Sequence, residues 1–182
     1  MPRYVALFGS INVGGNRLTM AELRAAFEAE GLSHVETVVA SGNVLFDHPE
    51  RPDEGLEEKL TLMMRHRFGM KSAALVRSRD AMAAAIAENP FHNGQENFVH
   101  TMFLDGPVDV DAFAALVAGH EGPERIAAGD RAVHIDYVEG AGRSKLTGGL
   151  IERRLGRKGT ARNLRSLKRI LAKLDESERA GG

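Results

Sequence analysis

The chain contains no cysteine, and this absence removes several kinds of chemistry at once. Without a thiol there is no disulfide, no thiolate nucleophile and no cysteine-ligated metal. No apolar run is long enough to cross a bilayer, and the opening apolar stretch that ends at Phe8 is too short for the core of a signal peptide. We therefore expect a cytoplasmic protein without membrane contact.

Common site motifs are also missing. No Gly-x-Gly-x-x-Gly run provides a dinucleotide fingerprint, and no Gly-x-Ser-x-Gly elbow indicates a serine hydrolase. The 7 histidines are scattered, without an i, i+4 pair or a carboxylate placed beside one in a known ligand pattern. We predict no metal site and no cofactor.

Charge is distributed unevenly, although the net charge is only −1. The segment from Arg143 to Lys173 contains 11 Lys and Arg and a single acid, Glu152, which leaves 13 bases against 24 acids elsewhere. Such a segment either docks on the acidic remainder of the same protein or offers a surface to an anionic partner.

The order of the predicted elements indicates an α+β fold. In the first half we predict strands at 4–8, 35–40, 44–46 and 73–76, and amphipathic helices after Thr19 and around Leu60. Thr19 and Glu22 form a capping-box pattern at the first of these helices. This β-α-β-β-α-β order is that of a ferredoxin-like sandwich, and a further helix over 79–88 follows it.

The second half repeats part of this order. We predict a strand at 97–104, a helix at 108–118 capped by Asp109, a hairpin of 125–128 with 132–138, and helices at 145–155 and 164–174. This is a second, smaller βαββαα half. The expected domains are 1–88 and 97–175, with a connecting seam at 89–96 and a frayed tail at 176–182.

Two loops near the N-terminus are candidates for binding an anion. The first, from Gly9 to Asn16, has the Gly-x4-Gly spacing of a P-loop but lacks its Lys and Ser/Thr, so nucleotide hydrolysis is not predicted. The amides of Gly14 and Gly15, with Asn12 beside them, either hold an anion or form an ordinary turn. The same alternatives apply to the segment from Ser41 to Asn43, where a hairpin turn is favoured.

Two predicted helix starts carry cations. Ser144 is a suitable N-cap for a helix from Lys145 onward, which places Arg143 and Lys145 at the positive end of the helix dipole. Arg162, followed by Asn163, precedes the last predicted helix in the same way. An anion bound between the two starts would explain both, and the alternative is exposed cations that need no partner.

The last predicted helix has a basic side formed by Arg165, Lys168, Arg169 and Lys173. This side either tracks a phosphate backbone or is a solvated face. Residues 143–182 contain no Phe, Tyr or Trp on which bases could stack, and this weakens an RNA-binding interpretation.

Motifs spread along the chain resemble a single family. They are Ile11-Asn-Val-Gly-Gly15, Ser41-Gly-Asn-Val44, Asn89-Pro-Phe91, Gly142-Arg-Ser-Lys-Leu-Thr147 and Gly159-Thr-Ala-Arg-Asn163. Their order, from about residue 3 to 175, is similar to that of the bacterial family catalogued as domain of unknown function 1697. The resemblance implies an α+β fold with a ferredoxin-like N-terminal part and no established activity. Gly9-Ser10 stands where the family usually has Arg-Gly.

The leading hypothesis is a binding protein for a small phosphate-bearing or carboxylate ligand, or for nucleic acid. The predicted ligand-binding residues are Asn12, Gly14, Gly15, Ser41, Asn43, Arg143, Ser144, Lys145, Arg162 and Asn163. Two alternatives stay open. One is an enzyme acting on a phosphorylated small molecule, with His134, Asp136 or Glu139 as the nearest general base. The other is a protein-interaction module whose basic helix meets an acidic partner or the acidic half of a second copy of the chain.

Overall fold

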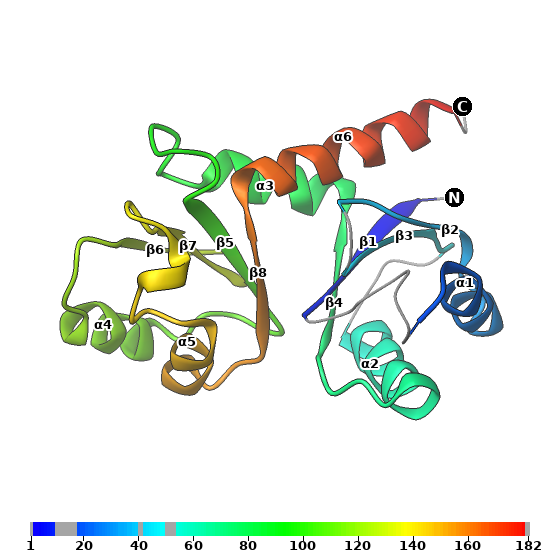
Figure 1. Ribbon diagram of the computed structural model, residues 1–182, viewed down its shortest axis with the longest axis horizontal. Coiled ribbons are helices and arrows are strands. Elements are labelled where there is room, and N and C mark those ends of the chain that lie inside the picture. Colours follow the sequence, from blue (N-terminus) through cyan, green and yellow to red (C-terminus); the bar gives the residue numbers. More distant parts are fainter. Residues whose placement is uncertain (1, 10–17, 40–41, 50–53, 181–182) are drawn as a thin grey trace. The chain divides into compact units, whose positions relative to one another are not determined.

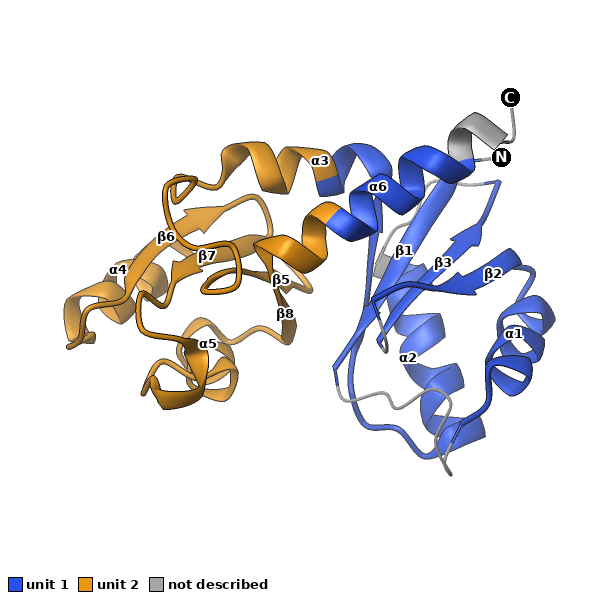
Figure 2. Cartoon of the chain, turned by 45° about the horizontal axis from the view of Figure 1, so that its top comes forward, with its two compact units in different colours: residues 1–82, 169–182 blue, residues 83–168 orange. Residues whose placement is uncertain are grey.

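Short strands form two four-stranded antiparallel sheets in the computed structural model (Figure 1). The structure describes residues 2–9, 18–39, 42–49 and 54–180. Contacts group the chain into two compact units, coloured separately in Figure 2. Unit 1 consists of residues 1–82 and 169–182, and unit 2 of residues 83–168.

Unit 1 has the predicted β-α-β-β-α-β order. Its elements are β1 (Arg3–Phe8), α1 (Met20–Ala29), β2 (Ser33–Thr37), β3 (Asn43–Asp47), α2 (Glu54–Phe68) and β4 (Ala74–Ser78). The strands pair in the order β2-β3-β1-β4, with every pair antiparallel. This is the strand order of a ferredoxin-like sheet, so the predicted fold of the first half is confirmed.

One face of the unit 1 sheet packs on α1 and α2. Alternate residues of β1, including Tyr4 and Phe8, point into this core together with Phe27 of α1 and Phe46 of β3. Phe27 lies edge-on to Phe46, with 5.8 Å between the ring centres. The predicted capping box at Thr19 is present, and it fixes where α1 begins.

Unit 2 repeats the same topology. Its elements are the end of α3 (Arg79–Glu88), β5 (Val99–Leu104), α4 (Val110–Gly119), β6 (Arg125–Gly129), β7 (Ala132–Asp136), the 3₁₀ turn η1 (Ala141–Arg143), α5 (Gly148–Leu155), β8 (Gly159–Asn163) and the start of α6 (Leu164–Ala180). The strand order is β6-β7-β5-β8. Leu116 of α4 and Ile151 of α5 pack on one face of this sheet against Met102 and Val133.

Three features of the second half differ from the prediction. Residues 159–163, expected at a helix start, form strand β8, which pairs antiparallel with β5, so the half is βαββαβ before its last helix. Helix α5 begins at Gly148 instead of Lys145, because Thr147 and not Ser144 caps it. Helix α6 continues to Ala180, through the tail expected to be frayed.

Helix α6 is shared between the units, which differs from the predicted domain ranges. Its residues from Arg169 onward group with unit 1. There Asp175 accepts a hydrogen bond from Arg79 Nε at 2.7 Å, and Ser177 donates one to Glu36 at 3.2 Å. The boundary between the units falls within α3, after Met82, and so precedes the expected seam at 89–96. No helix in the described ranges is both long and apolar enough to cross a membrane.

Candidate functional site

The predicted site residues of the two N-terminal loops are mostly outside the described residues. Asn12, Gly14, Gly15 and Ser41 all lie there. Asn43 is described, and its Nδ2 donates hydrogen bonds to the carbonyl oxygens at positions 38 and 39, at 3.1 and 3.4 Å. Asn43 therefore braces the turn between β2 and β3, the role favoured for this segment from the sequence.

The residues from Arg143 to Lys145 do not lie at a helix start. Arg143 ends the short turn η1, and both it and Lys145 are exposed. Ser144 donates a hydrogen bond from its hydroxyl to Glu124 Oε1 at 2.6 Å and accepts one from the amide of Leu146 at 3.0 Å. The helix-dipole argument for an anion at these residues is therefore wrong, since α5 begins at Gly148.

The contact with Ser144 favours the ionised form of Glu124. The hydrogen bond from Ser144 is the largest influence that lowers the pKa of the Glu124 carboxyl below its ordinary value. His120 Nε2 lies 3.0 Å from the other carboxylate oxygen. Glu124 thus ties the loop that contains Ser144 to the segment before β6.

Replacing Ser144 by Ala should lower the free energy of unfolding by about 1–2 kcal/mol, because a nearly buried carboxylate loses a hydrogen-bond donor. It should also raise the pKa of Glu124 toward its ordinary value. Urea unfolding and an NMR titration of the carboxyl carbons measure these two effects. In Ser166→Ala, where the structure assigns only the backbone amide of Ser166 to a hydrogen bond with a described residue, both quantities should be unchanged.

Arg162 and Asn163 lie in β8. Arg162 donates from Nη1 to the Thr160 hydroxyl at 2.8 Å and to the Ala161 carbonyl at 2.9 Å. Burial lowers the pKa of Arg162 to about 10. Asn163 accepts a hydrogen bond from the amide of Ser166 at 2.8 Å, which caps α6. Helix α6 thus starts where predicted, and the amide of Ser166 in its first turn is already hydrogen-bonded within the chain.

Two of the three candidate general bases are held inside unit 2. His134 is fully buried, with Nδ1 2.8 Å from the Thr101 hydroxyl and Nε2 3.0 Å from Glu88. Asp136 is 4% exposed and accepts a hydrogen bond from Arg125 at 2.5 Å. Neither side chain is available to a ligand in this arrangement.

A basic pocket lies at the end of α5, inside the positively charged segment. Its volume is about 450 Å³, and three of its lining side chains are cations: Arg153, Arg157 and Lys158. The other lining residues are Asp105, Gly149, Glu152 and Gly156. We call this set the α5 pocket.

Backbone geometry fixes the position of Arg157 in the α5 pocket. Gly156 adopts a left-handed conformation, φ 64°, that ends α5 and turns the chain. Arg157 then lies over Gly106, where a Cβ atom would overlap the guanidinium group. Its Nε donates to the carbonyl of Pro107 at 3.2 Å, and its Nη1 lies 4.0 Å from Asp105.

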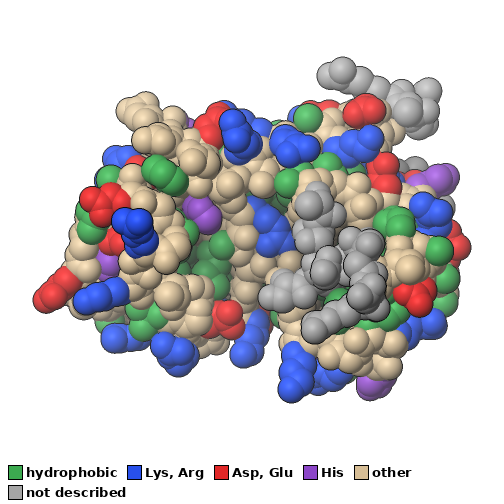
Figure 3. All heavy atoms as spheres, viewed as in Figure 1, with side chains coloured by type: hydrophobic (Ala, Val, Ile, Leu, Met, Phe, Trp, Pro, Cys, Tyr) green, Lys and Arg blue, Asp and Glu red, His purple; other side chains and the backbone are tan. Residues whose placement is uncertain are grey.

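The α5 pocket has more positive than negative charge. Lys158 lies 3.8 Å from Glu152, and Arg157 is near Asp105, so two of its three cations face a carboxylate. Arg153 is exposed and forms no ion pair with any residue that the structure describes. Figure 3 shows Lys and Arg side chains along the edge of unit 2 that carries α4 and α5. The arrangement is suited to holding an anionic group.

None of the predicted site residues lines the α5 pocket. The sequence does contain a signal for it, the run Arg153-Arg-Leu-Gly-Arg-Lys158. A helix end at Gly156 brings the bases on both sides of it to one place. These residues lie in the basic segment from Arg143 to Lys173 but are not among the predicted ligand-binding residues.

The comparisons with known proteins identify the family. The model of the family described as "Protein of unknown function (DUF1697)" matches residues 1–134. The chain belongs to the DUF1697 family. Among curated proteins none matches the sequence. The structure resembles that of a conserved bacterial protein from Streptococcus pneumoniae, with 25% sequence identity and a TM-score of 0.72 over 95% of this chain and 98% of that one. The match to the DUF1697 model ends before α5 and most of its pocket.

Proposed function

We propose that this DUF1697 protein binds a small phosphate-bearing ligand in the α5 pocket. The observation that carries the proposal is the convergence of Arg153, Arg157 and Lys158 on one pocket of about 450 Å³. A guanidinium group can donate two parallel hydrogen bonds to the oxygens of one phosphate, and an ammonium group adds a point charge. Arg153 supplies the charge that no described carboxylate neutralises.

A small ligand fits better than nucleic acid. The volume of the α5 pocket is within the range of small-molecule sites, roughly 300–1,000 Å³. Residues 143–182 contain no aromatic side chain on which a base could stack.

Replacing Arg153 and Arg157 together by Gln should weaken the binding of inorganic phosphate by about tenfold or more, since each change removes a charge-assisted hydrogen bond. Isothermal titration calorimetry at low salt measures this. The matched control is the double change of Arg65 and Arg67 to Gln in the last turn of α2, which removes the same charge from exposed positions in unit 1.

The same titration decides between the ligand classes. A short single-stranded oligonucleotide in place of phosphate should bind no more tightly, and with little dependence on salt. Tight oligonucleotide binding with a steep salt slope would instead favour a nucleic-acid protein. Equal phosphate affinity in the pocket variant and the control would remove the α5 pocket as the site.

A further inference from the structure

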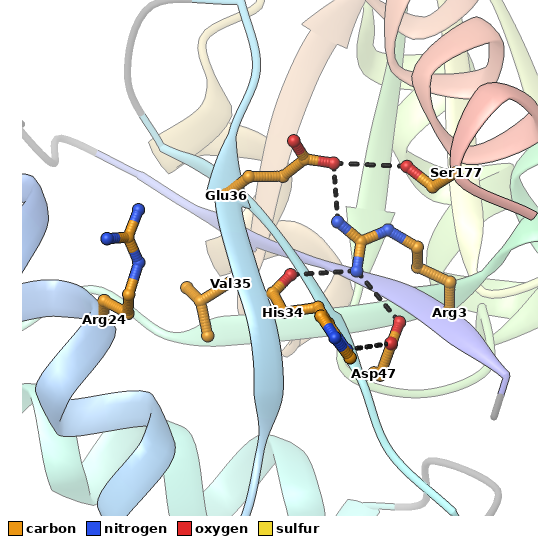
Figure 4. Close-up of a pocket in the computed structure, with 7 residues that line it drawn as sticks. All are labelled: Arg3, Arg24, His34, Val35, Glu36, Asp47 and Ser177. Atoms are coloured by element: carbon orange, nitrogen blue, oxygen red, sulfur yellow. Dashed lines mark hydrogen bonds and ion pairs between the residues drawn. The ribbon is translucent and has the colours of Figure 1, made fainter. Parts of the chain in front are cut away.

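A second pocket lies in unit 1 around the outer strand β2. Its volume is about 520 Å³, and it is lined by Arg3, Arg24, His34, Val35, Glu36, Asp47 and Ser177. Figure 4 shows these side chains. All of them belong to unit 1, because the residues of α6 beyond Arg169 are part of that unit. We call this set the β2 pocket.

Arg3 organises the β2 pocket. Strand register places Arg3 directly opposite Asp47, and its Nη1 donates to that carboxylate and to the carbonyl of His34, both at 2.9 Å. Nη2 donates to Glu36 at 2.5 Å. The Arg3 side chain is 7% exposed, so the guanidinium group holds β2 and β3 in a fixed relation.

His34 stands on an irregular part of the strand. The pairing of β2 with β3 shifts between Ser33 and Glu36, and His34 has a φ of 50°. Residues other than glycine rarely adopt this conformation, and such strain is concentrated at functional sites. Bulges that re-aim a side chain also occur next to active sites.

Asp47 orients the imidazole ring. The distance from His34 Nδ1 to Asp47 Oδ2 is 2.7 Å. The carboxylate accepts a hydrogen bond from the protonated Nδ1, so the lone pair of a neutral ring is on Nε2. The His34 side chain is 78% exposed, and its Nε2 has no hydrogen-bond partner among the residues that the structure describes. The ring is thus held at one nitrogen and open at the other.

The charges that face His34 come from every neighbouring element. They are Asp47 of β3, Arg3 of β1, Glu36 of β2, Arg24 of α1 and, beside Glu36, Lys173 of α6. Among the lining residues, two arginines balance two carboxylates. A proton on His34 therefore changes the formal charge of the lining from zero to +1, which favours an anion.

We propose that the β2 pocket binds a small phosphate-bearing molecule and that His34 takes up a proton when it does. The proton comes from solvent and attaches to Nε2, the Nδ1–H keeps its hydrogen bond to the Asp47 carboxylate, and the imidazolium donates a hydrogen bond from Nε2 to a phosphate oxygen. No covalent bond other than that N–H is formed. Arg24 also lines the pocket and lies on the other side of β2 from Arg3 (Figure 4). Its positive charge adds to that of the imidazolium in attracting an anion to the pocket. The proposal does not depend on the α5 pocket.

The test is made in the full chain carrying Arg153→Gln and Arg157→Gln, so that phosphate bound at the α5 pocket does not interfere. Inorganic phosphate is titrated calorimetrically at about pH 6 and about pH 8, on either side of the ordinary imidazole pKa of about 6.5. Buffers of different ionisation enthalpy report the protons taken up. NMR spectra of the imidazole groups follow His34 directly.

We expect phosphate to bind at least about tenfold more tightly at the lower pH, with proton uptake that is larger at the higher pH, where the free imidazole is neutral, and with a shift of the His34 resonances. His34→Asn should remove the pH dependence and the proton uptake while keeping the fold, since Asn tolerates a positive φ. Arg24→Gln should weaken binding at both pH values.

Two exposed residues of α2 supply the controls, His66→Gln and Arg67→Gln, both of which should bind as the parent does. Equal affinity in His34→Asn and the parent at the lower pH would overturn the proposal, and so would binding without proton uptake. Absence of phosphate binding at both pH values would overturn it as well. None of these results bears on the α5 pocket, which is tested by comparing the loss of phosphate binding in the Arg153→Gln, Arg157→Gln variant with that in its own control.

Discussion

Replacing Arg3 by Met should lower the free energy of unfolding by about 3 kcal/mol, because two carboxylates then lose the cation that they share. The side chain of Arg3 is 7% exposed, while those of Asp47 and Glu36 are 16% and 36% exposed. Partial exposure lets water solvate Glu36, and Lys173 lies 3.9 Å from it, so most of the loss comes from Asp47. Urea unfolding followed by circular dichroism gives the value.

Arg24→Met is the control for this change, since Arg24 is exposed on α1 and forms no ion pair with a described residue. It should cost less than about 0.5 kcal/mol. A similar small loss for Arg3→Met would mean that the buried network contributes little to stability. It would also remove the argument that Arg3 holds the β2 pocket in shape.

Local signals in the sequence accounted well for unit 1 and for the start of α4 in unit 2. Thr19 and Glu22 predicted the start of α1 by side-chain to backbone hydrogen bonds that need only neighbouring residues, and Asp109 did the same for α4. Strand β8 was missed for the opposite reason. Its sequence from Gly159 to Asn163 is short and polar, and what makes it a strand is its pairing with β5, more than fifty residues earlier.

The candidate sites were less predictable, because they depend on contacts between distant residues. Arg3, Glu36 and Asp47 meet only through the strand register of β1, β2 and β3. Arg157 takes its position from Gly106, on another loop of the same unit. Ser144 is among the predicted ligand-binding residues, but its hydrogen bond to Glu124, which gives it a structural role, joins positions too far apart in the chain for the sequence to indicate it.

The two units share more than their strand order. Each has an aspartate at the end of its third strand, Asp47 in β3 and Asp136 in β7, and each aspartate is paired with an arginine. In unit 2 the second oxygen of Asp136 accepts the amide of Val138 at 2.9 Å. In unit 1 the corresponding oxygen is used by His34, which leaves an imidazole nitrogen open at the surface. The same position is thus structural in one unit and available for ligand chemistry in the other.

Unit 2 should lose stability on mild acidification, because His134 is fully buried as a neutral ring. Burial lowers the pKa of His134, and this exceeds the opposite influence of Glu88. The unfolded chain therefore binds a proton more readily than the folded one. The stability contributed by neutral His134 is complete above the unfolded pKa of about 6.5 and decreases as the pH falls toward the lower folded value, by up to about 1.4 kcal/mol per pH unit.

His134→Gln tests this, since glutamine can still bond to Thr101 and Glu88 but does not titrate. Its unfolding free energy should fall less than that of the parent between about pH 6.5 and about pH 5, whatever its absolute stability. A residual slope is expected, because burial also lowers the pKa of His100. The lowered pKa of Glu124 acts below its ordinary range, so that group contributes little in this window. The exposed control His66→Gln should follow the parent. If the unfolding free energies of the parent, His134→Gln and His66→Gln had the same pH dependence, His134 would accept a proton without loss of stability. Its contacts with Thr101 and Glu88 would then be looser than the distances of 2.8 and 3.0 Å imply.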